Sequence, residues 1–181
     1  YKHYTDQTQL INEVAEKISE NRVVAVCRGR MEWGPRALGN RSILANPCDP
    51  EAKTRLNDHI KHREQFRPFA PSVQAEHANK YFDVPDNPHL TDYMLAVHDV
   101  KPDWQEDLPS ITHVNGTARL QTVKSSRQPW FHQLLTAVNQ TIGVPIVINT
   151  SFNLSGEPIV ENPKDALQTL QNSKIDHLLL E

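Results

Sequence analysis

The chain has 181 residues, a formal net charge of −3 at pH 7 and 38% hydrophobic residues, values typical of one compact globular domain. No run of about 18 apolar residues, internal repeat or low-complexity segment occurs, which excludes a membrane-spanning helix and a repeat array from this sequence. We therefore expect a single soluble, cytoplasmic domain over residues 1–181, with its two cysteines reduced.

Positive charge is concentrated in one third of the chain. From Arg28 to Arg67 there are nine Lys and Arg against five Asp and Glu, a local balance of +4, so the remaining residues carry −7. An acidic protein with one cationic region is poorly suited to coating nucleic acid but well suited to attracting a small phosphorylated ligand. A solvated helical face of mixed charge is the alternative for part of this region, above all Lys53 and Arg55.

The first elements lead into a loop rich in glycine and arginine. Helical spacing of apolar residues predicts a helix over residues 8–21, and β-branched runs predict strands over 23–27 and 42–46. Between the strands lies GRMEWGPRALGNRS, residues 29–42, with three glycines, three arginines and one glutamate. Such a loop suits a bound anion, with Arg36 as a candidate contact. The alternative is an ordinary connection whose arginines face water or carboxylates.

The next segment carries two further candidate cations. Asp49 and the following proline predict the start of a helix that runs to about Arg63, with Lys61 near its C-terminal end. A cation is favourable there in any case, so a structural role for Lys61 stays open. Two prolines then make residues 64–73 extended, and we expect Phe66 and Phe69 to anchor Arg67 as a ligand clamp.

In the middle of the chain we predict a short helix over residues 74–81, a loop over 83–89 and a strand over 93–100. An exposed loop over 101–110 and two strands around an Asn-Gly turn, residues 111–123, follow. Arg119 and Gln121 share one face of the last strand. His113 is interpreted as a hydrogen-bonded structural residue rather than a catalyst.

The last third is predicted to alternate helix and strand. An amphipathic helix over residues 130–142 is followed by a strand over 144–148, a helix over 163–172 and a strand over 175–180. The first of these strands runs into a hydroxyl-rich turn containing Asn149 and Ser151, which suits phosphate contacts. Local turn chemistry is the alternative for that turn. The predicted fold class is α/β with a mixed, twisted sheet.

Five blocks of sequence resemble the C-terminal domain of the NodU/CmcH-type O-carbamoyltransferases, a family of nodulation and antibiotic-tailoring enzymes. They are residues 29–42, Asn57 with 60–64, 66–71, 116–119 and 149–153. The resemblance implies a YrdC-like fold, a twisted mixed β-sheet flanked by helices. It also implies formation of carbamoyl adenylate from carbamoyl phosphate and ATP with Mg²⁺. A separate, metal-bound N-terminal Kae1-like domain would then transfer the carbamoyl group to a hydroxyl of a small molecule.

The family pattern also implies site residues. It assigns contacts with the phosphates or the carbamoyl adenylate to Arg36, Lys61, Arg67, Arg119, Asn149 and Ser151, the first three as catalytic residues. Attack on an α-phosphate builds charge on its oxygens, so preorganised cations and donors suffice for such chemistry. No metal site is expected in this chain, because His59 and His62 lack a convincing third ligand.

Two departures and one alternative accompany the resemblance. Asn115 stands where the family has an aspartate, and Cys27 with Arg28 replaces an aromatic–polar pair. The alternative function is a non-catalytic nucleotide- or RNA-binding module of YrdC type. The small positive charge and few neighbouring aromatic residues argue against RNA, and we expect neither nucleic acid nor membrane as a partner.

Overall fold

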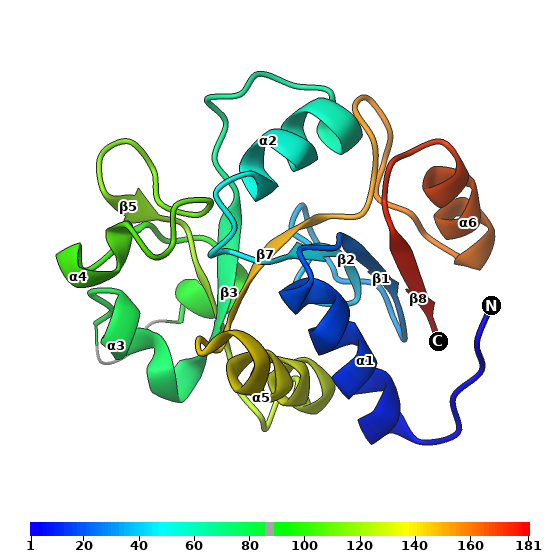
Figure 1. Cartoon of the computed structure of the whole chain (residues 1–181), viewed down its shortest axis with the longest axis horizontal. Helices are drawn as coiled ribbons and strands as arrows, with labels where there is room; N and C mark the ends of the chain where they lie inside the picture. The colour runs from blue at the N-terminus through cyan, green and yellow to red at the C-terminus, as the bar shows by residue number, and fades with distance from the viewer. Residues whose placement is uncertain (86–88) are drawn as a thin grey trace.

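The computed structural model describes residues 1–85 and 89–181, and a six-stranded mixed β-sheet forms its centre (Figure 1). The strand order is β6-β3-β7-β2-β1-β8, with the pairs β3/β6 and β1/β8 parallel and the other three antiparallel. The six strands are β1 (Val24–Cys27), β2 (Arg41–Ala45), β3 (Ala70–Gln74), β6 (Gln121–Val123), β7 (Ile146–Ser151) and β8 (His177–Leu180). A small separate sheet pairs β4 (His98–Asp99) with β5 (Thr117–Ala118).

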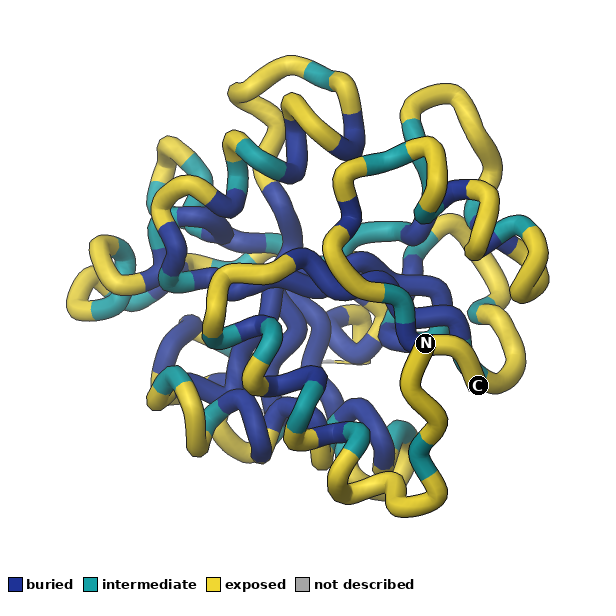
Figure 2. The backbone as a smooth tube through the Cα atoms, turned by 45° about the vertical axis from the view of Figure 1, so that its right-hand side comes forward, coloured by how far each residue is buried: buried dark blue, intermediate teal, exposed yellow. Residues whose placement is uncertain are grey.

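Helices cover both faces of the sheet, so the domain has three layers. Side chains alternate along β1, with Val24 and Val26 packing toward α1 and α5 while Ala25 and Cys27 enter the core on the opposite face. Figure 2 shows the strands as a buried band between more exposed helices. One face of the sheet carries α1 (Gln7–Ser19) and α5 (Pro129–Ile142). The remaining helical segments are α2 (Ala52–Leu56), the π-helix η1 (Asn57–Lys61), η2 (Ala75–His77), α3 (Ala78–Tyr81), η3 (Thr91–Tyr93), α4 (Pro102–Gln105) and α6 (Pro163–Gln171).

The ends of the long helices follow from local sequence. Asp6 accepts a hydrogen bond from Thr8 N at the start of α1, and Asn162 caps α6 through Lys164 N. Gly143, at φ 83°, ends α5 in the left-handed conformation. The predicted α/β class with a mixed sheet is confirmed. Within the described residues, no helix has the length and apolar composition needed to cross a membrane.

The middle of the chain differs from its prediction. The strand expected over residues 93–100 is wrong except at β4, because Tyr93 ends a 3₁₀ turn and Met94 is left-handed. The loop expected over 101–110 contains α4, and Leu108 is fully buried. Residues 111–114 form no strand, since the amide N–H of His113 donates to Thr117 O to close the turn. The loop predicted over 83–89 includes residues 86–88, which lie outside the described residues.

The helix predicted to run to about Arg63 changes character halfway and ends earlier. After α2 the chain widens into the π-helix η1, and His62 at φ 45° terminates it. Asp49 accepts a hydrogen bond from Glu51 N just before the helix starts. A π-helical turn often marks a functional site. Here it directs Asn57 and Lys61 inward, and both are buried.

Candidate functional site

Backbone and side-chain hydrogen bonds hold the loop between β1 and β2 in one conformation. The Glu32 carboxylate accepts from the backbone N–H of Leu38 and of Asn40, both at 2.7 Å. Arg41 is buried, and its guanidinium donates to the carbonyl oxygens of Arg28 at 2.7 Å and Glu161 at 3.1 Å. Arg41 therefore fixes the base of the loop through its two terminal nitrogens, while its Nε is buried without an acceptor in the described part of the chain.

A buried amide network lies beneath the centre of this loop. The Leu38 carbonyl accepts from Gln121 Nε2 at 3.0 Å and from Gln128 Nε2 at 2.8 Å. Asn149, on β7, donates through Nδ2 to the Ala37 carbonyl at 3.2 Å, while its Oδ1 is buried and has no partner among the described residues. The network thus fixes the backbone next to Arg36, and Asn149 retains one free acceptor.

Three arginines from different segments lie close together, and we call them the arginine cluster: Arg36, Arg63 and Arg119. Burial lowers the pKa of Arg119, and the neighbouring charges of Arg36 and Arg63 lower it further. The Nε atoms of Arg36 and Arg119 are buried without an acceptor in the described part of the chain. No described carboxylate forms an ion pair with any of the three, and Glu64 acts only on Arg63, whose pKa it raises. The cluster is therefore a positive site that suits a polyanion.

Arg63 is the member of the cluster that sequence reasoning missed. Its Nε donates to Asn57 Oδ1 at 2.8 Å, and its guanidinium lies 4.6 Å from the centre of the Phe69 ring. Burial lowers the pKa of Arg63, nearby Arg67 lowers it further, and the Glu64 carboxylate acts in the opposite direction. The sequence signal was present: Arg63 follows Lys61 by two residues in a block of the resemblance. The expected anchored arginine therefore exists, but it is Arg63.

Arg67 is placed differently from the expectation. Its side chain is 52% exposed and pairs with Glu64 at 2.9 Å. Phe66 is 75% exposed, so the anchoring of Arg67 between two phenylalanines is wrong, because only Phe69 packs into the core and its ring contacts Arg63. Arg67 nevertheless lines an open hollow of about 550 Å³ together with Arg63, and its role as a ligand contact stays a prediction.

Lys61 reaches across from η1 to the turn that follows β7. Its Nζ donates to Ser151 O at 2.6 Å, Asn153 Oδ1 at 2.9 Å and Asn153 O at 3.0 Å. Burial lowers the pKa of Lys61 to about 7, with a further contribution from Arg63. Ser151 Oγ donates to Asn153 Oδ1 at 2.7 Å, so the turn chemistry considered as an alternative is present.

The two departures from the family pattern have local explanations. Arg28 pairs with Glu181 at 2.8 Å, and its guanidinium lies 4.6 Å from the centre of the Trp130 ring, which accounts for the added cation. Asn115 Oδ1 accepts from Thr117 Oγ1 at 2.8 Å, and Thr117 Oγ1 lies 3.0 Å from His113 Nδ1. Asn115 and His113 therefore stabilise their own turn.

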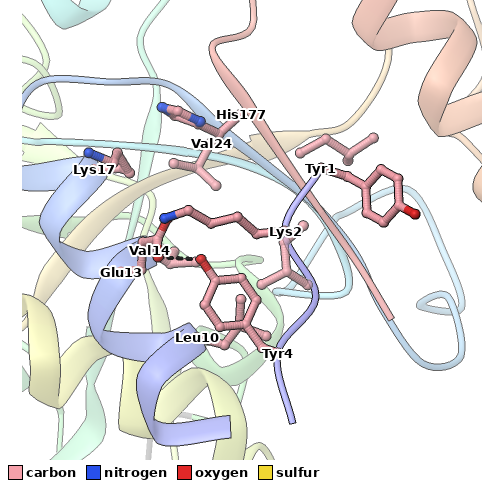
Figure 3. Close-up of a pocket in the computed structure, with 11 residues that line it drawn as sticks. Tyr1, Lys2, Tyr4, Leu10, Glu13, Val14, Lys17, Val24 and His177 are labelled. Atoms are coloured by element: carbon pink, nitrogen blue, oxygen red, sulfur yellow. Dashed lines mark hydrogen bonds and ion pairs between the residues drawn. The ribbon is translucent and has the colours of Figure 1, made fainter. Parts of the chain in front are cut away.

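A second hollow, of about 500 Å³, lies between the N-terminal segment, α1 and β8 (Figure 3). Three of its polar groups are paired with one another, since Lys2 Nζ and Tyr4 Oη both donate to the Glu13 carboxylate. Apolar residues such as Leu10 and Val24 form much of the remaining wall. This hollow offers no cluster of free cations, so the arginine cluster is the better candidate for an anion.

Comparison with known proteins supplies the family. Residues 15–181 match the model described as the carbamoyltransferase C-terminus. The chain belongs to this family. It is 43% identical over 169 residues to nodulation protein NolNO of Sinorhizobium fredii, covering 93% of this chain and 25% of that protein. Across the first curated relatives, the chain spans about a quarter to a third of their length.

Solved structures establish the fold. The carbamoyltransferase C-terminus domain is similar to full-length HypF in its phosphate- and nucleotide-bound form, with TM-score 0.64, 20% identity and coverage of 94% of this chain and 24% of HypF. Escherichia coli YciO matches with TM-score 0.64 and 13% identity, covering 96% of this chain and 78% of that one. The domain therefore has the YrdC-like fold, as the resemblance implied.

Proposed function

We propose that this domain binds ATP with Mg²⁺ and forms carbamoyl adenylate from carbamoyl phosphate. The observation that carries the proposal is the arginine cluster, in which three guanidinium groups gather and none forms an ion pair with a described carboxylate. Like charges brought together and partly desolvated raise the free energy of the folded protein, and a bound polyphosphate removes that cost. Membership of the carbamoyltransferase C-terminus family supports the same ligand class, as does the similarity to HypF, whose structure holds phosphate and nucleotide.

The proposed contacts begin with three buried atoms that lack partners among the described residues, which are Arg36 Nε, Arg119 Nε and Asn149 Oδ1, and add neighbouring groups that are already hydrogen-bonded. Arg36, Arg63 and Arg119 hold phosphate oxygens, and Arg67 at the open hollow and Lys61 beside Ser151 complete the positive charge. Asn149 Oδ1, buried without a partner among the described residues, accepts a hydrogen bond from the nucleotide or the carbamoyl amide. Ser151 Oγ exchanges its bond to Asn153 for one to a phosphate.

Formation of carbamoyl adenylate requires the protein to position the reactants and to stabilise negative charge. In the first step, one water molecule hydrolyses carbamoyl phosphate to carbamate and releases phosphate. The carbamate then reacts with ATP, which supplies AMP and releases pyrophosphate. In the second step a carbamate oxygen bonds to the α-phosphorus, and pyrophosphate leaves with the electron pair of the broken P–O bond. Negative charge grows on the phosphate oxygens, where preorganised guanidinium groups stabilise it.

Mg²⁺ enters with the nucleotide in this proposal. Among residues 1–85 and 89–181, no group of three or more His, Cys, Asp and Glu side chains is placed to hold a metal ion. Mg²⁺ is commonly held through substrate phosphates and water, with few protein ligands. Its chemistry here is to neutralise charge on the leaving pyrophosphate.

Isotope exchange between labelled pyrophosphate and ATP tests the proposed step. We expect label to enter ATP only when carbamoyl phosphate is present, because exchange requires reversible adenylate formation. Exchange that is equally fast without carbamoyl phosphate would contradict the choice of substrate. Salt-sensitive binding of RNA that displaces ATP would instead favour the alternative, an RNA-binding module of YrdC type.

A further inference from the structure

The two edges of the six-stranded sheet are protected to different degrees. At the β6 edge, η3 lies against the strand, Thr122 Oγ1 donates to Asp92 Oδ1 at 2.6 Å, and Lys124 pairs with the same carboxylate at 2.7 Å. The other edge is β8, which reads His-Leu-Leu-Leu over residues 177–180 and contains neither lysine nor proline. Charged side chains, proline and a covering element are common means of preventing an edge strand from pairing with another chain. The composition of β8 is therefore that of a strand able to accept a partner.

The backbone of β8 has bonding groups that point away from the sheet. The N–H groups of His177 and Glu181 donate to carbonyl oxygens at the two ends of β1, at 3.2 and 3.1 Å, so the odd-numbered residues bond to β1. Backbone groups alternate in direction along a strand, and the N–H and C=O of Leu178 and Leu180 therefore face the free edge. No described backbone group bonds to either residue on that side. These unpaired groups are a template for a further strand.

The N-terminal segment runs beside this edge without pairing with it (Figure 1). Residues 2–7 and 178–181 line a hollow of about 430 Å³, and the segment forms no described backbone hydrogen bond with β8. Its anchors are on α1, where Lys2 Nζ donates to the Glu13 carboxylate at 2.8 Å and Tyr4 Oη donates to the same group (Figure 3). Exposed side-chain contacts of this kind contribute little to stability, so the segment can move aside when a strand enters.

We propose that two copies of this chain pair through β8, antiparallel and about a two-fold axis at Leu179. In this register Leu178 of each copy lies opposite Leu180 of the other, and the two residues exchange both of their outward main-chain hydrogen bonds. The sheet of one copy then continues into the sheet of the other, and we call this contact the β8 interface. None of its residues belongs to the arginine cluster, so the inference does not rest on the proposed function.

The side chains at the ends of β8 favour a second copy over an unrelated strand. His177 and Glu181 lie at equal distances along the chain from Leu179, so the same register places His177 of each copy opposite Glu181 of the other. A carboxylate accepts a hydrogen bond from an imidazole, and complementary pairs directly across two strands stabilise them. Glu181 keeps its ion pair with Arg28, at 2.8 Å. Because each copy contributes one short strand, the interface is small, and we expect a weak dimer that forms at high concentration.

Sedimentation equilibrium over a range of protein concentrations tests the β8 interface. The wild type should be a reversible mixture of monomer and dimer. Leu180→Pro removes an outward N–H without affecting the ladder to β1, and it should weaken dimerisation by about 10-fold or more. Leu180→Ala, the matched control, shortens the same side chain but keeps the N–H, so it should weaken dimerisation much less. Thermal unfolding checks that both variants remain folded.

A second pair of variants tests the register without changing the backbone. His177→Glu places carboxylates opposite each other and should weaken the dimer, whereas His177→Lys should preserve it. This pair carries the test if Leu180→Pro does not fold. A wild type that remains monomeric up to its solubility limit, or a dimer that His177→Glu leaves intact, would overturn the proposal.

Amide hydrogen exchange identifies the strand that pairs. In dilute solution the N–H groups of Leu178 and Leu180 should exchange quickly and that of Leu179 slowly, because Leu179 N–H faces β1. In concentrated solution all three should be protected in the wild type, but only Leu179 in His177→Glu. Protection of Leu178 and Leu180 in the monomer would show that the N-terminal segment already pairs with β8, which would contradict the proposal.

Discussion

Arg36 and Arg119 each keep a buried Nε–H without an acceptor among the described residues. An unsatisfied buried donor costs about 1–3 kcal/mol, more when it is charged. Two such donors beside Arg63, with no described carboxylate in contact, are an unfavourable arrangement for an unliganded surface. A planar guanidinium offsets that cost when it engages two phosphate oxygens at once.

The first prediction compares two arginines by replacing each with lysine. Arg119→Lys should weaken ATP binding by about 1–3 kcal/mol because an ammonium cannot bind two oxygens in one plane. Arg67→Lys should cost less, since Arg67 is half exposed and paired with Glu64. Calorimetric titration gives the affinities, and thermal unfolding should be nearly unchanged in both. Equal losses at the two positions would contradict the ranking.

The second prediction concerns the pH dependence at Lys61. Burial lowers the pKa of this lysine from 10.5 to about 7, Arg63 is the neighbouring charge that lowers it further, and the Ser151 and Asn153 oxygens around it do not titrate. Between pH 7 and 10.5 the unfolded chain binds the proton that folded Lys61 releases. Its contribution to stability therefore rises with pH across this window, by at most about 1.4 kcal/mol per pH unit.

ATP affinity should move in the opposite direction, because neutral Lys61 has one N–H fewer for the turn. Affinity should fall as pH rises through about 7, and Lys61→Met should abolish both trends. Denaturant unfolding and ATP titration at a series of pH values measure the two quantities. Unchanged pH profiles in Lys61→Met would assign the trends to other groups.

At the scale of elements, the loop between β1 and β2 depends on glycine for its path. Gly39 has φ 124°, and a Cβ there would lie 2.6 Å from Phe131 Cδ1 on α5. Gly34 has φ 108°, but no described atom lies within 4 Å of its Cβ position. Both glycines have a positive φ, but Gly39 lies against α5 whereas Gly34 lies in open space.

The third prediction uses this pair. Gly39→Ala should destabilise the domain by about 2–4 kcal/mol, since it adds an aromatic clash to backbone strain. Gly34→Ala should cost about 1–2 kcal/mol, from backbone strain alone. The difference in free energy of unfolding, measured in urea, isolates the contact between the loop and α5. Equal costs would mean that the loop does not pack on Phe131 in solution.

The elements that sequence reasoning predicted well have their signals nearby in the chain. Asp6, Asn162 and Gly143 mark helix ends by local hydrogen bonds and backbone conformation, and α1, α5 and α6 follow the prediction. The prediction was wrong between Thr91 and Thr117, because the contacts that shape this region are with residues far away in the sequence. β4 pairs with β5 about twenty residues away, and Leu108 is buried by tertiary packing that a loop-like composition does not reveal.

In the candidate site, too, the residues with a local signal in the sequence were predicted and the residue defined by tertiary contacts was missed. Arg36, Lys61 and Arg119 were identified from residue type and resemblance, and the structure places Arg36 and Arg119 together. Arg63 was missed because its distinguishing contacts, with Asn57 and Phe69, require the π-helical turn. A π-helical turn and an α-helical turn look alike in sequence, so the choice between Arg63 and Arg67 as the anchored residue needed coordinates.

At the scale of the whole molecule, the chain spans about a quarter to a third of its first curated relatives. Carbamoyl adenylate is a reactive intermediate that water would hydrolyse, so we propose that an adjoining Kae1-like domain receives it in a shared site that excludes water. The described part of this chain has no cluster of side chains suited to a transition metal. In this proposal the adjoining domain carries out the acceptor chemistry.

The fourth prediction follows from this division. Incubation of this chain with ATP, carbamoyl phosphate and hydroxyl acceptors should give slow release of pyrophosphate and no O-carbamoylated product. Metal analysis of the purified chain should find no stoichiometric iron or zinc. Sustained formation of a carbamoylated product by this chain alone would show that transfer needs no second domain.

Calorimetric titration of the folded chain with ATP and Mg²⁺ tests the central claim most directly. The wild type should bind one ATP, more weakly as salt is added, and the double variant Arg36→Met/Arg119→Met should lose most of the affinity while remaining folded. Lys174→Met, with one exposed charge removed, should bind as the wild type does. No ATP binding by the folded wild type, or undiminished binding by the double variant, would contradict a nucleotide site at the arginine cluster.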